Sequence, residues 1–136
     1  LWAVITDHDR KIKFNVGGTP LIGPHVALID PELMLGLPPA VTAATGMDAL
    51  AHNLEAYCAP FYHPWSAGVA LEGMRLVKDN LAKAVKKPKD IDARGNMLVA
   101  SAMGATAFQR GLGGIHADFF ATAAFSGITV CDWRSD

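Results

Sequence analysis

Met47-Asp48-Ala49-Leu50-Ala51-His52-Asn53-Leu54-Glu55 stands near the middle of the chain and predicts part of a helix that extends from about residue 47 to 58. Asp48 and His52 are four residues apart, so a helix places them on one face with their Cβ atoms about 5–6 Å apart. A carboxylate oxygen and an imidazole nitrogen at that separation can bind one divalent cation. The neighbouring side chains are small or apolar, and a buried polar pair needs partners. The pair therefore predicts a metal site, although an ordinary surface contact between Asp and His has the same spacing.

Further helices flank this segment on both sides. Pro38-Pro39 begins the helical region, and Thr45-Gly46 is expected to loosen or break it. After a loop between Pro60 and Pro64, apolar residues recur at helical spacing from about residue 65 to 84. Asp90 is a predicted N-cap of another helix that runs to about residue 110.

The first thirty residues predict strands instead. Residues 2–6 and 11–16 are short apolar or alternating runs on either side of a polar turn, as in a hairpin with a half-exposed strand. Residues 25–30 predict a third, buried strand, and residues 31–34 predict one helical turn capped by Asp30. The expected fold class is mainly α: part of a helical metal-binding domain, preceded by the last strands of an α/β nucleotide-binding domain.

The composition excludes several classes of protein. The chain has 136 residues, of which 51% are hydrophobic and 18% charged, and its net charge is −1. This balance gives no reason to expect nucleic acid or an anionic membrane as a partner. No apolar run is long enough for a transmembrane helix, and the N-terminus lacks the pattern of a signal peptide. Two distant cysteines favour a reducing, cytoplasmic location, and the start at Leu1 suggests an internal fragment.

Two further residues are weaker candidates when taken alone. His116 follows Gly113-Gly114, where glycines allow the backbone to approach a ligand closely, but a packed or surface histidine is the ordinary interpretation. Lys13 lies on the predicted hairpin, where a solvated lysine is ordinary. No nucleophile with a matching base can be identified, so no catalytic residue is assigned.

Residues 27–55 resemble the iron-containing (group III) alcohol dehydrogenase family. The similar features are Ile29-Asp30, Pro38-Pro39, the small residues leading to Gly46, Asp48-Ala49-Leu50 with His52, and Glu55. Residues 4–7, 13–14 and 111–117 are also similar to the family in order and spacing, so the resemblance covers about residues 3–117.

The resemblance implies a fold and a chemistry. Family members have an α/β domain that binds NAD(P), an all-helical domain, and Fe²⁺ or Zn²⁺ held by one Asp and three His in the cleft between them. By motif position, Asp48, His52 and His116 would be metal ligands, and Lys13 and Val41 would contact the cofactor. The metal would lower the pKa of a small alcohol by Lewis acidity, and the nicotinamide would accept hydride. These ligand types do not discriminate between Fe²⁺ and Zn²⁺.

The sequence also departs from the family pattern. The positions four and fourteen residues after His116, where the family has histidines, are Phe120 and Val130. We therefore expect three regions: 1–34 from the cofactor domain, 35–117 from the start of the helical domain, and 118–136 as a divergent tail. Such a chain is expected to be inactive alone and to come from a homo-oligomer. The alternatives are a non-catalytic helical interaction remnant, or a relative similar to glycerol dehydrogenases or to a cyclising synthase of aromatic biosynthesis.

Overall fold

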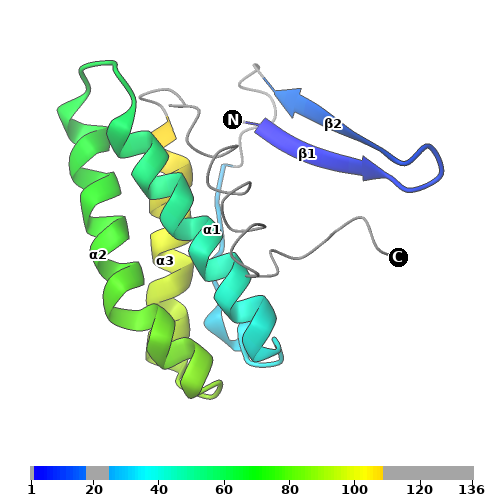
Figure 1. The fold of residues 1–136 in the computed structure, drawn as a ribbon, viewed down its shortest axis with the longest axis vertical. Coiled ribbons are helices and arrows are strands. Elements are labelled where there is room, and N and C mark those ends of the chain that lie inside the picture. Colours follow the sequence, from blue (N-terminus) through cyan, green and yellow to red (C-terminus); the bar gives the residue numbers. More distant parts are fainter. Residues whose placement is uncertain (1, 18–24, 109–136) are drawn as a thin grey trace, which may run out of the picture.

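The structure is a computed structural model that describes residues 2–17 and 25–108. In chain order the elements are β1 (Trp2–Asp7), β2 (Ile12–Gly17), the 3₁₀ helix η2 (Pro31–Met34), α1 (Pro39–Cys58), α2 (Pro64–Lys86) and α3 (Ile91–Ala107). Figure 1 shows the hairpin of β1 and β2 and the helical bundle formed by α1, α2 and α3. The expected class is confirmed: the chain is mainly α, and strands precede the helices.

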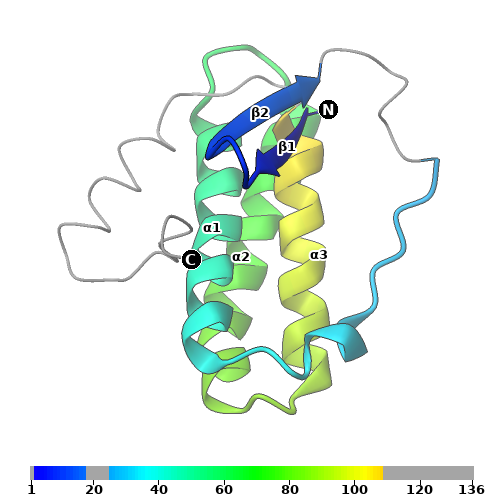
Figure 2. The ribbon, with the colours of Figure 1, turned by 90° about the vertical axis from the view of Figure 1, so that its right-hand side faces the viewer.

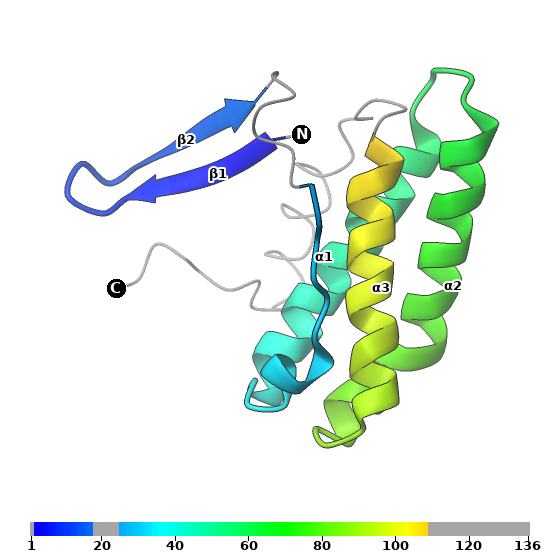
Figure 3. The same ribbon diagram turned by 180° about the vertical axis from the view of Figure 1, so that it is seen from behind.

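The predicted hairpin is present. β1 and β2 are antiparallel, with Ile5 opposite Phe14 and Asp7 opposite Ile12. In the turn, Lys11 adopts a φ of 53°, and the Arg10 amide donates to Asp7 Oδ1 at 3.0 Å. This local hydrogen bond is the kind by which aspartate favours turns. Figures 1 and 3 place the hairpin to one side of the bundle, away from α2.

The three helices pack through small side chains. α1 and α3 run in the same direction and α2 runs in the opposite one, so neighbouring helices in sequence are antiparallel (Figure 2). Two buried clusters lie between them, and five of their six residues are alanine: Ala49, Val77 and Ala100, and then Ala56, Ala70 and Ala107. Small residues bury little apolar area each, but they allow helix axes to approach closely. No described helix is both long and apolar enough to cross a membrane.

The ends of the helices follow the sequence closely. Asp30 Oδ1 accepts from the Glu32 amide at 2.9 Å, and Asp90 Oδ1 accepts from the Ala93 amide at 3.0 Å, so both predicted caps are confirmed. α2 begins at Pro64, and His63 Nδ1 accepts from the Ser66 amide at 3.2 Å. A histidine in a proline-rich loop has the appearance of a solvated residue, but His63 is the N-cap of α2.

The predicted third strand at residues 25–30 is wrong. These residues form no strand, and Val26 and Leu28 are 82% and 91% exposed. A strand exists only where a neighbour completes its hydrogen bonds, and in the described part of the chain the sheet contains β1 and β2 alone. An apolar run indicates that a segment is buried somewhere, but it does not supply the partner strand.

The predicted break at Thr45-Gly46 is also wrong, because α1 continues through both residues. Thr45 Oγ1 bonds back to the Val41 carbonyl at 2.9 Å, within the helix. A Cβ on Gly46 would lie 2.3 Å from Leu81 Cδ1 and 3.1 Å from Met97 Cε. The glycine is therefore a point of close helix packing and not the end of a helix.

Candidate metal-binding site

Asp48 and His52 lie where the sequence analysis places them. One turn of α1 separates the two side chains, and Asp48 Oδ1 is 3.7 Å from His52 Nε2. Asp48 is 40% exposed and His52 is 28% exposed, so both groups are accessible from outside the helix core. The arrangement presents an anionic oxygen and an imidazole nitrogen in the same direction.

This spacing fits two ligands of one metal ion. Two donors held about 2.1 Å from a tetrahedral Zn²⁺ lie about 3.4 Å apart, close to the 3.7 Å between Asp48 Oδ1 and His52 Nε2. Within residues 2–17 and 25–108, no group of three or more His, Cys, Asp or Glu side chains gathers at one point. His116, the third expected ligand, lies outside the described residues. The part of the site that the structure describes is therefore a pair of donors.

The C-terminal end of α3 packs against the imidazole of His52. Its ring packs edge-on against Phe108, with ring centroids 5.0 Å apart and planes at 68°. A Cβ on Gly104, one turn before Phe108, would lie 3.0 Å from His52 Cβ. Gly104 thus lets the two helices approach at the histidine, and Phe108 limits the ring orientations that remain.

The predicted cofactor residues are only partly described. Val41 is half-buried in the first turn of α1, seven residues before Asp48. Seven residues are nearly two helical turns, so Val41, Asp48 and His52 share a face. Lys13 lies in β2 with its backbone opposite Thr6, but its side chain is outside what the structure describes.

Asn53 is a feature that the sequence analysis missed. It follows His52 directly and is fully buried. Its Nδ2 donates to the Ala49 carbonyl of its own helix at 2.8 Å and to the Ala100 carbonyl of α3 at 2.9 Å. The signal was available in the sequence, because Asn53 continues the spacing of Gly46 and Ala49 and is a polar residue on an otherwise small, apolar stripe.

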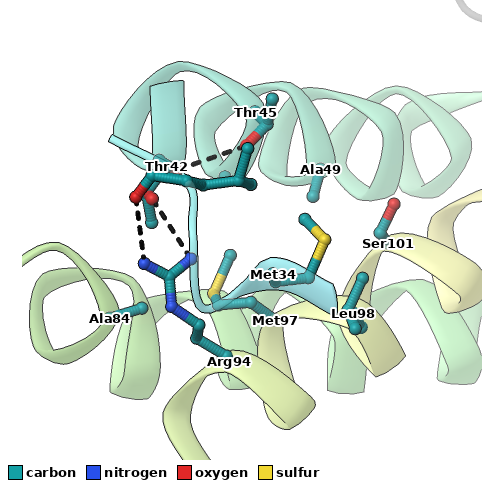
Figure 4. Close-up of a pocket in the computed structure, with 11 residues that line it drawn as sticks. Met34, Thr42, Thr45, Ala49, Ala84, Arg94, Met97, Leu98 and Ser101 are labelled. Atoms are coloured by element: carbon teal, nitrogen blue, oxygen red, sulfur yellow. Dashed lines mark hydrogen bonds between the residues drawn. The ribbon is translucent and has the colours of Figure 1, made fainter. Parts of the chain in front are cut away.

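A small pocket of about 80 Å³ lies near the start of α1, between α1, α3 and η2. Figure 4 shows Arg94 of α3 pointing at Thr42 on one side, with Met34 and Met97 nearby. Arg94 is buried, and it donates to the Pro88 carbonyl at 2.7 Å, to Thr42 Oγ1 at 3.3 Å and to the Leu37 carbonyl at 3.4 Å. These bonds join the segment before α1 to the turn before α3, so the guanidinium has a structural role.

Comparisons with known proteins show which family the chain resembles. Residues 42–129 match the description "Fe-containing alcohol dehydrogenase family, C-terminal". This match contains Asp48 and His52, and it extends twelve residues beyond Ala117, where the motif resemblance ends. The chain is 45% identical to a 4-hydroxybutyrate dehydrogenase of Cupriavidus necator over 113 residues, or 83% of this chain and 29% of that protein. It is 46% identical to an NAD-dependent methanol dehydrogenase of Bacillus methanolicus over 115 residues, or 84% of this chain and 30% of that protein.

Solved structures are similar in fold as well as in sequence. A sulfoacetaldehyde reductase from Bifidobacterium kashiwanohense, in complex with NAD⁺, has a TM-score of 0.78 and 31% identity over 93% of this chain and 34% of that one. A 1,3-propanediol oxidoreductase has a TM-score of 0.76 and 37% identity over 90% of this chain and 32% of that one. The chain thus spans about a third of the length of these relatives. Since the family match includes well over half of the chain, the chain belongs to the iron-containing alcohol dehydrogenase family.

Proposed function

We propose that this chain is part of an NAD(P)- and metal-dependent alcohol dehydrogenase that interconverts a small primary alcohol and its aldehyde. The observation that carries the proposal is the Asp48–His52 pair, with 3.7 Å between its oxygen and nitrogen. The pair lies within the residues that match the family. Bound there, Fe²⁺ or Zn²⁺ would supply Lewis acidity that lowers the pKa of an alcohol.

The residues of the chain then have distinct roles. Asp48 and His52 hold the ion from one face of α1, and His116 supplies a further imidazole. Val41 shares the face of Asp48 and His52 and would line the nucleotide site, and Lys13 would be the second residue that contacts the cofactor. Asp48 also contributes a negative charge, which reduces the net charge of the site when a divalent cation is bound.

In this proposal the chain forms part of a larger, two-domain protein. Residues 1–34 would belong to the cofactor domain, 35–117 to the helical metal-binding domain, and 118–136 to a tail that lacks the remaining histidine ligand. Catalysis requires the nicotinamide to be held against the substrate, and positioning supplies much of an enzyme's rate. We therefore expect no turnover by the 136-residue chain alone. Steady NADH formation from ethanol or 1,2-propanediol by the purified chain would contradict this expectation.

The substrate class is proposed only as a small alcohol or aldehyde. The similar proteins are named for 4-hydroxybutyrate, methanol and sulfoacetaldehyde, which differ in charge and size. What they share is an alcohol or aldehyde carbon, and that is the group on which the proposed chemistry acts. A homo-oligomer and a cytoplasmic location remain predictions from the family resemblance and the composition.

The metal content of purified variants tests the proposal. Wild-type chain is expected to retain Fe²⁺ or Zn²⁺ after dialysis, and Asp48→Ala is expected to lose it. Asp79→Ala is the matched control, because Asp79 is an exposed aspartate of α2 that pairs with Arg75 at 2.7 Å. Equal metal content in all three proteins, or its absence from the wild type, would overturn the proposed function.

An interaction module without catalysis is a second candidate, favoured by exposed aromatic side chains in the α1–α2 loop and the first turn of α2. Phe61, Tyr62 and Trp65 are 66%, 91% and 76% exposed, and groups of such residues are typical of protein–protein contacts. Sedimentation velocity distinguishes the two candidates when it is combined with metal analysis. Metal-free chains that self-associate through this loop would favour the interaction module, and a monomer that retains metal would exclude it.

A further inference from the structure

We propose that Asn53 is a positioning residue that fixes the rotation and axial position of α1, and thereby the place of the His52 imidazole. The inference rests on the proposed function for its relevance to metal binding. Its structural part, which concerns where His52 lies, can be tested without metal.

The amide of Asn53 is held between two helices. Nδ2 donates to the Ala49 carbonyl at 2.8 Å and to the Ala100 carbonyl at 2.9 Å, so both of its hydrogens are used. If the amide were turned over, its oxygen would face two carbonyl oxygens, which would repel it. The donor pair therefore determines one orientation, and the bond to Ala100 connects α1 to α3.

A slot between two glycines accommodates this side chain. A Cβ on Gly73 of α2 would lie 2.0 Å from Asn53 Oδ1, and a Cβ on Gly104 of α3 would lie 3.0 Å from Asn53 Nδ2. The hypothetical Cβ of Gly104 would also lie 3.0 Å from His52 Cβ. One glycine of α3 is thus in close contact with both the asparagine and the histidine.

The oxygen of Asn53 indicates that this residue is not there for stability alone. Oδ1 is buried and accepts no hydrogen bond from the described residues. Leaving a buried acceptor unpaired is unfavourable, and an alanine at this position would avoid it. A single buried asparagine between packed helices can specify their register at a cost in stability. The neighbouring core residues are mostly alanines, whose similar shapes do little to specify register.

Three residues spaced one turn apart along α3 and its C-cap contact the part of α1 that carries the proposed site. Ala100 binds the Asn53 amide, Gly104 contacts the Cβ of His52, and Phe108 packs against the His52 ring at 5.0 Å. A shift of α1 along α3 would break the hydrogen bond from the Asn53 side chain to the Ala100 carbonyl. It would also move the His52 imidazole away from Phe108. Asn53 therefore acts on the site through the backbone that it shares with His52.

The test compares Asn53→Ala with Asn80→Ala in the full 136-residue chain. Asn80 is a buried asparagine of α2 whose Nδ2 donates to the Leu76 carbonyl and whose Oδ1 accepts from Asn96 of α3 at 3.2 Å. These hydrogen bonds lie within α2 and between α2 and α3, so Asn80 controls for loss of stability. The two measurements are the nuclear Overhauser effect between the His52 and Phe108 rings in metal-free protein, and the Kd for Zn²⁺.

Asn53→Ala is expected to weaken or abolish the His52–Phe108 signal and to raise the Kd for Zn²⁺ by about tenfold or more, as changes behind a metal ligand do. Asn80→Ala is expected to keep the ring signal and a Kd within about twofold of wild type. Gly104→Ala, which crowds the same slot, is a second variant that should reproduce the effect of Asn53→Ala.

The proposal is overturned if Asn53→Ala keeps the ring signal, or if Asn80→Ala weakens it equally. The proposed function fails separately, if Asp48→Ala leaves Zn²⁺ affinity unchanged. In that case the ring signal alone decides whether Asn53 positions His52.

Discussion

The substitution Gly73→Ala should destabilise the chain although it places a better helix former in the middle of α2. Alanine is favoured over glycine in a helix interior by about 1 kcal/mol. The added Cβ would lie 2.0 Å from Asn53 Oδ1 and 2.5 Å from its Cγ, which is closer than atoms can approach. Asn53 is fully buried and bonded on its other side, so it has no space into which to retreat.

The loss of stability in Gly73→Ala can be estimated from the hydrogen bonds lost, the overpacking and the gain in helix propensity. Displacing the amide loses two hydrogen bonds at about 1 kcal/mol each, and overpacking costs about 1–3 kcal/mol. After the gain in helix propensity is subtracted, Gly73→Ala is expected to lower the free energy of unfolding by about 2–4 kcal/mol. For a chain of this size that corresponds to a fall in Tm of about 8–16 °C.

A double-mutant cycle provides the decisive assay. Asn53→Ala removes the atoms that the added methyl would strike, so Gly73→Ala should cost little in that background. Urea unfolding followed by circular dichroism should give a coupling energy of at least about 2 kcal/mol between the two positions. If the two effects add to within about 0.5 kcal/mol, or if Gly73→Ala alone is as stable as wild type, the account of the slot is wrong.

Four other predictions concern the rest of the described chain. Gly46→Ala should be nearly neutral in thermal unfolding, because its added Cβ meets the ends of flexible side chains and the helix gains about 1 kcal/mol in propensity. Arg94→Met should lower the free energy of unfolding by about 2–3 kcal/mol, since three acceptors lose a charged donor. Asp90→Ala should cost about 1 kcal/mol in the same assay through loss of the α3 cap. The hydrogen bond from Arg75 lowers the pKa of Glu72 below its ordinary 4.5. The stability that this ion pair contributes is therefore present above pH 4.5 and is lost as the pH falls through the lowered pKa of Glu72. A carboxyl titration by NMR should show the Glu72 pKa return toward 4.5 in Arg75→Gln.

Local signals predicted the helices and their ends well. Caps such as Asp90 and apolar residues at helical spacing act within a few residues, so they are visible in one sequence. The spacing of Asp48 and His52 likewise needs only the geometry of one helix. These features do not depend on what the rest of the chain does.

The errors concern residues whose structure depends on distant partners. Gly46 has the same helix-breaking tendency in any sequence, but here Leu81 and Met97 from the other two helices pack closely against it and the helix continues. Residues 25–30 have the composition of a buried strand, yet no described strand lies beside them. The Asn53 slot requires Gly73 and Gly104, which are 20 and 51 residues further along the chain. None of these pairings is encoded in local periodicity.

The same dependence on distant partners bears on how a core made largely of alanine can hold the proposed metal-binding face in place. On α1 the packed stripe runs through Gly46, Ala49 and Asn53, and the proposed site lies about one residue to the side, at Asp48 and His52. One residue is about 100° of helix rotation, so a rotation of α1 by even part of that angle would change the direction in which both ligands point. Alanine contacts vary little with rotation, since the methyl groups are alike. The directional bond from Asn53 to Ala100 does vary, and it breaks when the helix turns. Orientation of the site is therefore expected to depend on one polar side chain and two glycines more than on the apolar area that the helices bury.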